Sequence, residues 1–189
     1  NLGEPKPMVI FICDEEDEKA DRALEGKIFS NEKIGVALKR FVCLKGSIQS
    51  IPDERLANKI ARQTPLFHFY DPSGKPMKVL KGKRATSTSA FTAMVTKVFD
   101  TSYSMNLKTY VKRMGKVLTA IDEVEREKEA LRNKMDRAAD KPGKLRQLQK
   151  EEEALAKEEQ KVKEMEEELL KAAALKPEFT AEGAESAQR

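Results

Sequence analysis

Hydrophobic and polar residues follow two different periods along the chain, and the change of period falls near residue 103. Before it, short strand candidates rich in apolar residues alternate with segments of helical spacing. The candidates cover residues 8–13, 41–48 and 66–70, and an amphipathic fourth covers 76–81. The first is apolar throughout, which predicts a strand buried on both faces. The Asp-Pro-Ser-Gly turn at 71–74 predicts an antiparallel hairpin between the last two strands.

Helical spacing fills the intervals between these strands. Ser30 is expected to cap a helix whose apolar face is Ile34, Ala37, Leu38 and Phe41. Asp53 is expected to start a second helix, with Leu56, Ile60 and Ala61 facing inward. Caps within 86–89 precede a third, whose apolar face is Phe91, Met94, Val95, Val98 and Phe99. The order β-α-β-α-β-β-α over residues 7–102 predicts an α/β fold, a mixed four-stranded sheet flanked by helices.

From residue 103 onward the apolar residues recur in alternating steps of four and three, as in a coiled coil. The seam contains Tyr110, Met114, Val117, Ile121, Val124, Leu131, Met135 and Ala138. Only Lys128 interrupts it. A turn near 140–143 ends this helix, because Pro142 and Gly143 are typical helix breakers.

A second helix follows, with Leu148, Leu155, Val162 and Leu169 spaced seven residues apart. Its other core position is weak, since it holds Glu152, Glu159 and Glu166. The pattern predicts an antiparallel coiled-coil hairpin over 103–175, after an α/β domain over 1–102 and before a flexible tail over 176–189. The first arm also carries Leu107, Val111 and Leu118, an apolar band wider than a two-helix hairpin needs. Docking on the chain's own domain and self-association explain that band equally well.

Two segments of residues 7–102 resemble the thioredoxin-like superfamily. The step from Ile28 to Lys33, reading Ile-Phe-Ser-Asn-Glu-Lys before the strand Phe41–Lys45, is similar to the branch with a lengthened first helix. The stretch from Thr64 to Lys75 resembles the family segment TP-x-F-x-F-x-DP-x-G. The resemblance implies a thioredoxin-like fold and a cis Pro65 that faces the family's active site.

Redox-active relatives carry a CxxC motif just after the first strand, where a helix N-terminus lowers the thiol pKa. In this chain acidic residues fill that place, and no CxxC occurs. The acidic run comprises Asp14, Glu15, Glu16, Asp17 and Glu18. A solvated helix cap is favoured over a hard-cation site, so neither a metal nor another cofactor is expected.

For the other candidate residues, structural roles explain the sequence at least as well as functional ones. Cys13 and Cys43 lie on predicted strands and are expected to be buried, inert thiols. His68, the only histidine, lies among aromatic residues and is expected to pack rather than catalyse. A basic stretch of Lys75, Lys78, Lys81, Lys83 and Arg84 follows the turn and either protects an edge strand or meets an acidic or phosphate-bearing partner.

Charge and hydropathy restrict the classes of partner and the cellular location that the sequence allows. Residues 1–102 carry 17 − 13 = +4 and residues 103–189 carry 19 − 19 = 0, too little excess to indicate nucleic acid. No apolar run is long enough to cross a membrane. The absence of a disulfide framework favours a reducing compartment, hence a soluble cytoplasmic protein, although the start at Asn1 leaves signal cleavage open.

The favoured interpretation is a non-catalytic, redox-inactive protein-binding module. Its groove, by resemblance, is formed by Thr64 and Pro65 with the acidic residues Asp14 to Asp17 beside it. Protein partners are expected, including a homodimer through the hairpin. Two alternatives stay open: a redox or chaperone-type protein that uses a single cysteine, and a nucleic-acid- or ribosome-associated factor with Lys78, Lys81, Lys83 and Arg84 as contacts.

Overall fold

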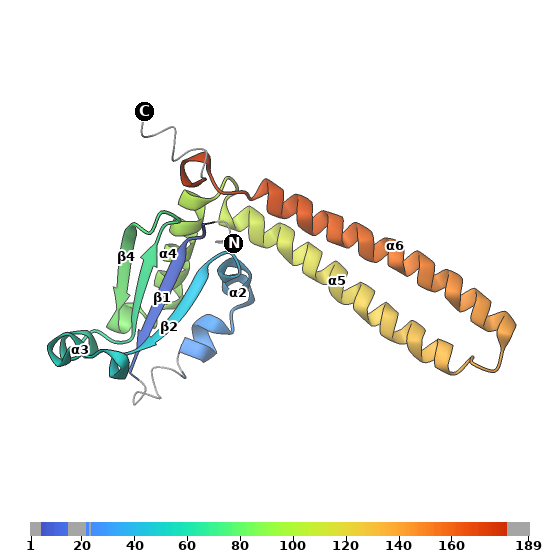
Figure 1. Cartoon of the computed structure of the whole chain (residues 1–189), viewed down its shortest axis with the longest axis horizontal. Helices are drawn as coiled ribbons and strands as arrows, with labels where there is room; N and C mark the ends of the chain where they lie inside the picture. Colours follow the sequence, from blue (N-terminus) through green and yellow to red (C-terminus); the bar gives the residue numbers. More distant parts are fainter. Residues whose placement is uncertain (1–4, 15–21, 23, 181–189) are drawn as a thin grey trace. The chain divides into compact units, whose positions relative to one another are not determined.

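The computed structural model describes residues 5–14, 22 and 24–180. By its internal contacts the chain divides into two compact units. The first comprises Asn1–Val111 with Ala174–Arg189, and the second comprises Lys112–Ala173. The first unit contains the sheet, and the second contains most of the two long helices (Figure 1).

The four strand candidates form one mixed sheet in the order β2-β1-β3-β4. The strands are β1 Met8–Cys13, β2 Val42–Ser47, β3 Leu66–Tyr70 and β4 Pro76–Lys81. β1 pairs with β2 in parallel and with β3 antiparallel, and β4 pairs antiparallel with β3. This arrangement confirms the expected mixed sheet, and it is that of a thioredoxin-like fold.

Up to residue 102, the described helical segments of this unit are η1 Glu25–Phe29, α2 Glu32–Leu38, η2 Ile48–Ser50, α3 Glu54–Ala61, η3 Gly82–Arg84 and α4 Thr88–Ser102. Four of them, α2, η2, α3 and α4, begin where a short polar side chain accepts a backbone hydrogen bond. Asp53 caps α3 and Ser87 caps α4, as expected. The cap of α2 is Asn31 rather than Ser30, whose hydroxyl instead donates to the Gly26 carbonyl.

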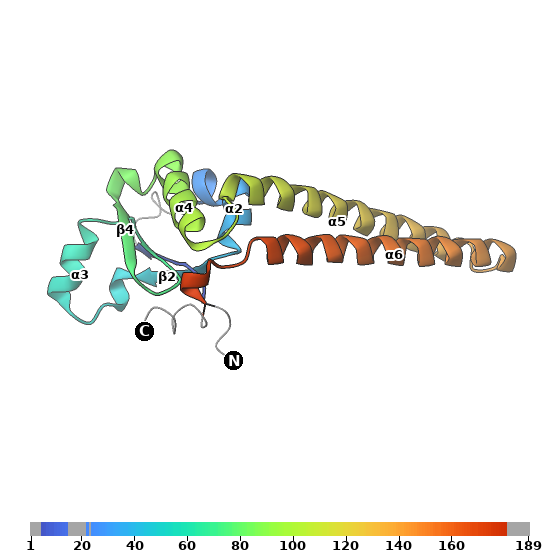
Figure 2. The same ribbon diagram turned by 90° about the horizontal axis from the view of Figure 1, so that it is seen from above.

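Aromatic rings fill the space between the sheet and the helices α2 and α4, which lie on the same side of it (Figure 2). Phe67 is 1% exposed, and its ring centroid lies 4.8 Å from those of both Phe11 and Phe91. Leu24 and Ile28 are fully buried as well. The register places Val9, Phe11 and Phe69 on this face, which is the main core.

The opposite sheet face is only partly covered, so the expectation that β1 is buried on both faces is wrong. Met8, Ile10 and Ile12 are half-buried, whereas Val42, Leu44 and Val79 are more than 40% exposed. The inward orientation expected for α3 is also wrong, because α3 has no buried residue and Leu56 is exposed. Figures 1 and 2 place α3 at the end of the strands, where it joins β2 to β3 without crossing a face.

The chain leaves and re-enters this unit at one place. The Tyr103 hydroxyl donates to the Arg40 carbonyl at 2.6 Å, and Tyr103 forms an isolated bridge with Leu175. The Lys176 backbone N–H donates to the Ser102 carbonyl, and the short helix η4 Pro177–Phe179 follows. The first residues of the expected tail are therefore hydrogen-bonded, and its last nine lie outside the described residues.

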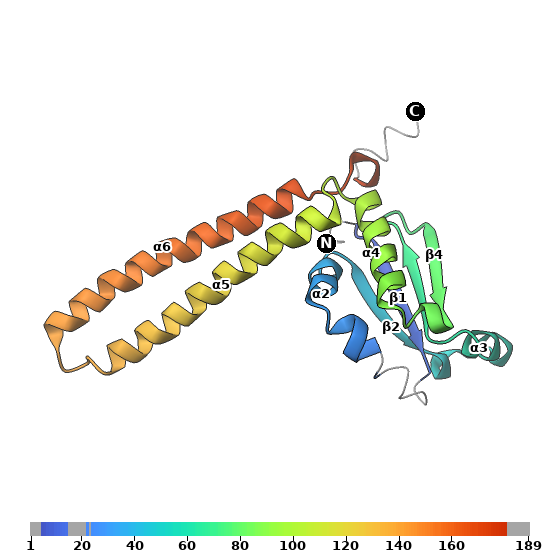
Figure 3. The same ribbon diagram turned by 180° about the vertical axis from the view of Figure 1, so that it is seen from behind.

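The two long helices are α5 Leu107–Asp136 and α6 Pro142–Ala172. They lie side by side in opposite directions in every view, which confirms the helical hairpin (Figure 3). The expected seam is buried at its leucine and valine positions, while Ile121 and Met135 are half-buried. The buried set comprises Met114, Val117, Val124 and Leu131 on α5, Ala138 in the turn after it, and Leu148, Leu155, Val162 and Leu169 on α6.

The one interruption of the seam has a partner across the hairpin. The Lys128 Nζ donates to the Glu159 Oε2 at 2.6 Å.

Within the described part of the chain, no helix combines the length and the apolar character that a membrane crossing requires.

Candidate functional site

The carboxyl ends of β1, β2 and β4 meet at one end of the sheet, where β3 begins. Three pieces of the chain converge there: Asp14 after β1, the short helix η2 after β2, and the segment 63–65 before β3. Residues distant in the chain thus come together at this end, which we call the sheet-end site.

Asp14 and Thr64 lie at the same end of the sheet, each two residues beyond the last pair of the antiparallel register, Ile12 with Leu66. The Asp14 carboxylate accepts a hydrogen bond from the Gln49 side-chain amide at 2.8 Å. The Thr64 hydroxyl donates to the Ala61 carbonyl at 2.8 Å. The Thr64–Pro65 peptide bond is cis, as the resemblance implies, and Pro65 is buried while Thr64 is half-buried.

The end of β4 closes the same site from the other side. The Gly82 N–H donates to the carbonyls of Gln63 and Pro65, at 3.1 and 3.0 Å. Gly82 has φ +53°, a backbone conformation that glycine adopts without the steric cost of a Cβ. The Lys81 ammonium reaches the Gln63 side-chain oxygen at 3.4 Å. The groove residues and the basic stretch, expected separately, therefore meet at Lys81.

Sequence reasoning missed Gln49 and Gln63 in this site. Gln49 was detectable, since it follows the second strand and the carboxyl ends of parallel strands lie at the same edge of a sheet. Of the acidic run, only Asp14 can be placed; Glu15, Glu16 and Asp17 lie outside the described residues. The remaining basic candidates Lys78, Lys83 and Arg84 are exposed on β4 and η3.

The two cysteines differ, and both are free thiols. Cys13 is 2% exposed, as expected, and its thiol donates to the Gly46 carbonyl at 3.6 Å. Cys43 is exposed, so the expectation that it is buried is wrong. The reason is its place on β2, which is an edge strand with a neighbour on one side only.

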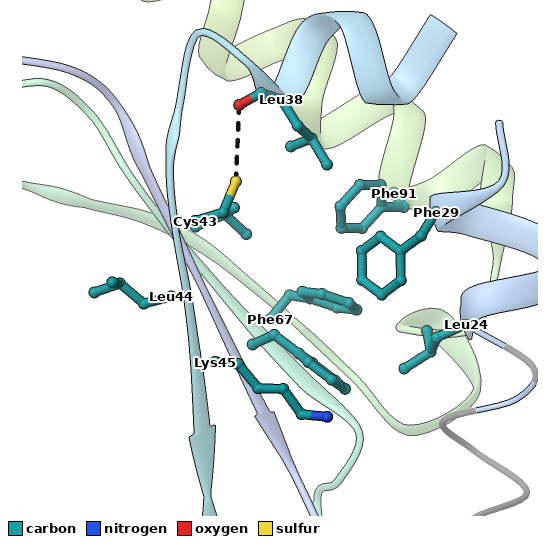
Figure 4. Close-up of a pocket in the computed structure, with 10 residues that line it drawn as sticks. Leu24, Phe29, Leu38, Cys43, Leu44, Lys45, Phe67 and Phe91 are labelled. Carbon is teal, nitrogen blue, oxygen red and sulfur yellow. Dashed lines mark hydrogen bonds between the residues drawn. The ribbon is translucent and has the colours of Figure 1, made fainter. Parts of the chain in front are cut away.

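Cys43 borders an apolar cavity of about 320 Å³ between the sheet and the helices (Figure 4). Its Sγ lies 3.8 Å from the Leu38 carbonyl oxygen, and the apolar surroundings raise the pKa of the Cys43 thiol by desolvation. In Figure 4 the rings of Phe29, Phe67 and Phe91 gather in this cavity, whereas Leu44 points away from it. The full lining consists of Val9, Phe11, Leu24, Phe29, Leu38, Cys43, Leu44, Lys45, Phe67 and Phe91.

Two further candidates have simple structural surroundings. His68 is half-buried on the less covered sheet face, opposite Ile10 and Val79, and its ring stacks with Tyr70 at 6.3 Å. Among the described residues, no three histidine, cysteine or acidic side chains come together as a metal site would require. The acidic run weighed as a cation site lies mostly outside those residues.

Comparison with solved structures shows a structural likeness over part of the chain. A thioredoxin from Thermus thermophilus, determined in solution, is similar with a TM-score of 0.40 and 19% identity. The similarity covers 49% of this chain and 73% of that chain. No protein-family model matches this chain, and neither does any curated protein.

Proposed function

We propose that this chain is a non-catalytic protein-binding module, a redox-inactive member of the thioredoxin-like branch with a lengthened first helix. The observation that carries the proposal is the state of its only two thiols. Cys13 is 2% exposed, and desolvation raises the pKa of Cys43. Thiol–disulfide exchange starts from a thiolate that can reach the substrate disulfide. Burial keeps Cys13 from such a substrate, and the surroundings of Cys43 favour its unreactive, protonated form.

The sheet-end site supplies the binding surface in this proposal. The side-chain amides of Gln49 and Gln63 lie at this end of the sheet, and Thr64 is half-buried beside them. Each amide bonds within the chain through its nitrogen and its oxygen, and that of Gln63 keeps a second N–H and a second lone pair for a ligand. Amides and hydroxyls of this kind both donate and accept, so they suit the backbone of an extended polypeptide. The nearest described carboxylate, Asp14, is already bonded to Gln49.

The helical hairpin serves in this proposal as an arm that presents a second surface. Met165 is 46% exposed on α6, and charged residues dominate the outer positions of both helices. Homodimerisation through the hairpin is the accompanying proposal. A sedimentation measurement that gives the monomer mass across a hundredfold range of concentration would remove it and leave the peptide-binding role intact.

Selection of random peptides on the full chain tests the binding role. We expect extended peptides that bind the wild type and lose affinity for Thr64→Arg, which places a long side chain in the sheet-end site. Thr119→Arg is the matched control, because Thr119 is exposed on α5 and belongs to the other compact unit. Selected peptides that bind both variants as well as the wild type would refute the assignment of the groove.

A second candidate function is thiol chemistry at Cys43, which its exposure favours. Insulin reduction with dithiothreitol as the reductant distinguishes it, compared between the wild type and Cys43→Ser. Turnover above the uncatalysed rate that the substitution abolishes would establish this candidate and remove the non-catalytic one. We expect no turnover in either protein.

A further inference from the structure

The two edges of the sheet differ in charge. Within β2 the one cation is Lys45, whose Nζ lies 5.9 Å from the centre of the Phe11 ring, and Lys39 and Arg40 precede the strand. The β4 edge is flanked by a run of cations that we call the β4 basic strip: Lys75, Lys78, Lys81, Lys83 and Arg84. Residues 72–84 contain no carboxylate. The preceding Asp71 is 9% exposed, and its carboxylate accepts from the Ser73 and Lys75 backbone N–H groups.

These cations are available for a partner. All five are exposed, and none of them takes part in the ion pairs found among the described residues, which join lysines and glutamates of the hairpin. Within the described sheet, β4 pairs with β3 alone, so its outer side presents unpaired backbone donors and acceptors. Lysines on such an edge repel a second copy of the same strand and attract a strand of opposite charge.

The register gives the strip a pattern that a paired strand can match. Lys78 lies opposite Phe69 and Lys81 lies opposite Leu66, three residues apart and therefore on opposite faces of the sheet. Val79 and Leu80 lie between them, also one on each face; Val79 is 41% exposed, whereas Leu80 is 2% exposed. A strand added at this edge would lie alongside a cation, the exposed Val79, the buried Leu80 and a second cation in succession.

We propose that the β4 edge binds an acidic extended peptide whose core reads acidic–apolar–apolar–acidic. This core is symmetric, so the same residues face each other whichever direction the peptide runs. The inference rests on the proposed protein-binding function and uses a surface that shares only Lys81 with the sheet-end site. A nucleic acid fits the strip less well, because it lacks the backbone groups that pair with a strand and because the two lysines lie on opposite faces.

Fluorescence anisotropy with the full chain and labelled ten-residue peptides tests the proposal. One peptide has a Glu-Val-Val-Glu core between threonines, and the control peptide has a Val-Glu-Glu-Val core with the same composition. We expect the first to bind at least about fivefold more tightly, since only its charges match the register of Lys78 and Lys81. Equal affinity for the two peptides, or no binding of the first at millimolar protein, overturns the inference.

Charge reversal identifies the surface. Lys78→Glu with Lys81→Glu should weaken the Glu-Val-Val-Glu peptide about tenfold or more, and a Lys-Val-Val-Lys peptide should then bind instead. Lys97→Glu with Lys108→Glu changes the net charge equally at exposed positions elsewhere and should change the affinity less than about twofold. Loss of peptide binding in both double variants would reveal a general charge effect and refute the strip.

Two further experiments distinguish a failure of this inference from a failure of the proposed sheet-end site, and a peptide surface from a nucleic-acid surface. Thr64→Arg should leave the acidic peptide bound; if it abolishes binding while the Lys78 and Lys81 variant retains it, the inference fails and the proposed groove stands. A ten-nucleotide single-stranded RNA should bind more weakly than the peptide at 150 mM salt. An RNA that binds more tightly and is lost with the same two lysines would make the strip a nucleic-acid surface and overturn the proposal.

Discussion

The cores of the two units of this chain are built from different kinds of side chain. The sheet unit has a core of stacked and edge-to-face rings, in which Phe67 contacts Phe11 and Phe91 from separate elements. The hairpin has no aromatic residue beyond Tyr110, and its buried positions are leucine, valine, methionine and alanine at heptad spacing. The sheet unit therefore concentrates its stability at a few positions, whereas the hairpin repeats a similar small contribution along its length.

The largest effect is expected at the centre of the ring cluster. Phe67→Ala removes a ring that is 1% exposed and should lower the free energy of unfolding of the sheet unit by about 3–5 kcal/mol. Hydrogen exchange read by mass spectrometry separates the two units, because each opens with its own amides. Amides of β1 and β3 should lose protection while those of residues 117–162 keep theirs.

Phe67→Leu is the matched control and should cost less, because it retains most of the buried volume. Equal loss of protection in both units would show that they unfold as one, and the contrast between them would then be wrong.

A seam substitution should have a smaller effect. Leu155→Ala removes a side chain that is 7% exposed and should cost about 2–3 kcal/mol, at the low end for leucine because the hairpin has room to close around the gap. Exposed Glu153→Ala on the same helix is the control, with an expected change within about 0.5 kcal/mol. Thermal unfolding followed by helical circular dichroism measures both, and similar losses would contradict the seam.

The sheet unit should also lose stability in alkali. Desolvation raises the pKa of Cys43, so the folded state holds the thiol proton more tightly than the unfolded chain does. The resulting stability is fully present below the ordinary thiol pKa of 9.0 and is lost as the pH rises through the raised value. Iodoacetamide labelling should be slower at Cys43 than at free cysteine at pH 8, and Cys43→Ala should remove the alkaline loss.

Labelling of Cys13 provides the internal comparison. Because Cys13 is 2% exposed, it should react only after unfolding in denaturant. If Cys43 reacted as fast as free cysteine at pH 8, its pKa would not be raised by desolvation, and the prediction would be wrong.

The hairpin was the easier unit to predict from sequence. Its heptad positions are local, so Leu148, Leu155, Val162 and Leu169 follow from spacing alone, and Pro142 and Gly143 mark the turn. The sequence marks Lys128 and Glu159 as polar residues at apolar positions, but it does not pair them. Pairing them required knowing how far one helix is displaced along the other, which spacing within each helix does not fix.

For the sheet unit, the sequence predicted the strands and their order along the chain, but not which of their faces are buried. An apolar run such as Met8 to Cys13 shows that a strand is present and cannot show whether a helix covers its second side. The same ambiguity led to the wrong expectations for α3 and Cys43. In the candidate site, Thr64 and Pro65 came from the family resemblance, whereas Gln63 and Gly82 depend on how β4 ends against β3.

The smallest effect is expected at the polar interruption of the seam, and its pH dependence is opposite to that of Cys43. Hydrogen bonds from Lys128 and Lys163 lower the pKa of Glu159 below 4.5. The stability from this contact is therefore present above that ordinary value and is lost as the pH falls through the lowered one. Glu159→Gln should reduce the melting temperature of the hairpin slightly at pH 7 and leave it unchanged at pH 2. Lys134→Met is the control, because the exposed Lys134 takes part in none of the ion pairs found among the described residues, and it should have no such pH-dependent difference. A difference for Glu159→Gln that persists at pH 2 would mean that packing of the glutamate stem, rather than its charge, holds the two helices together at this level.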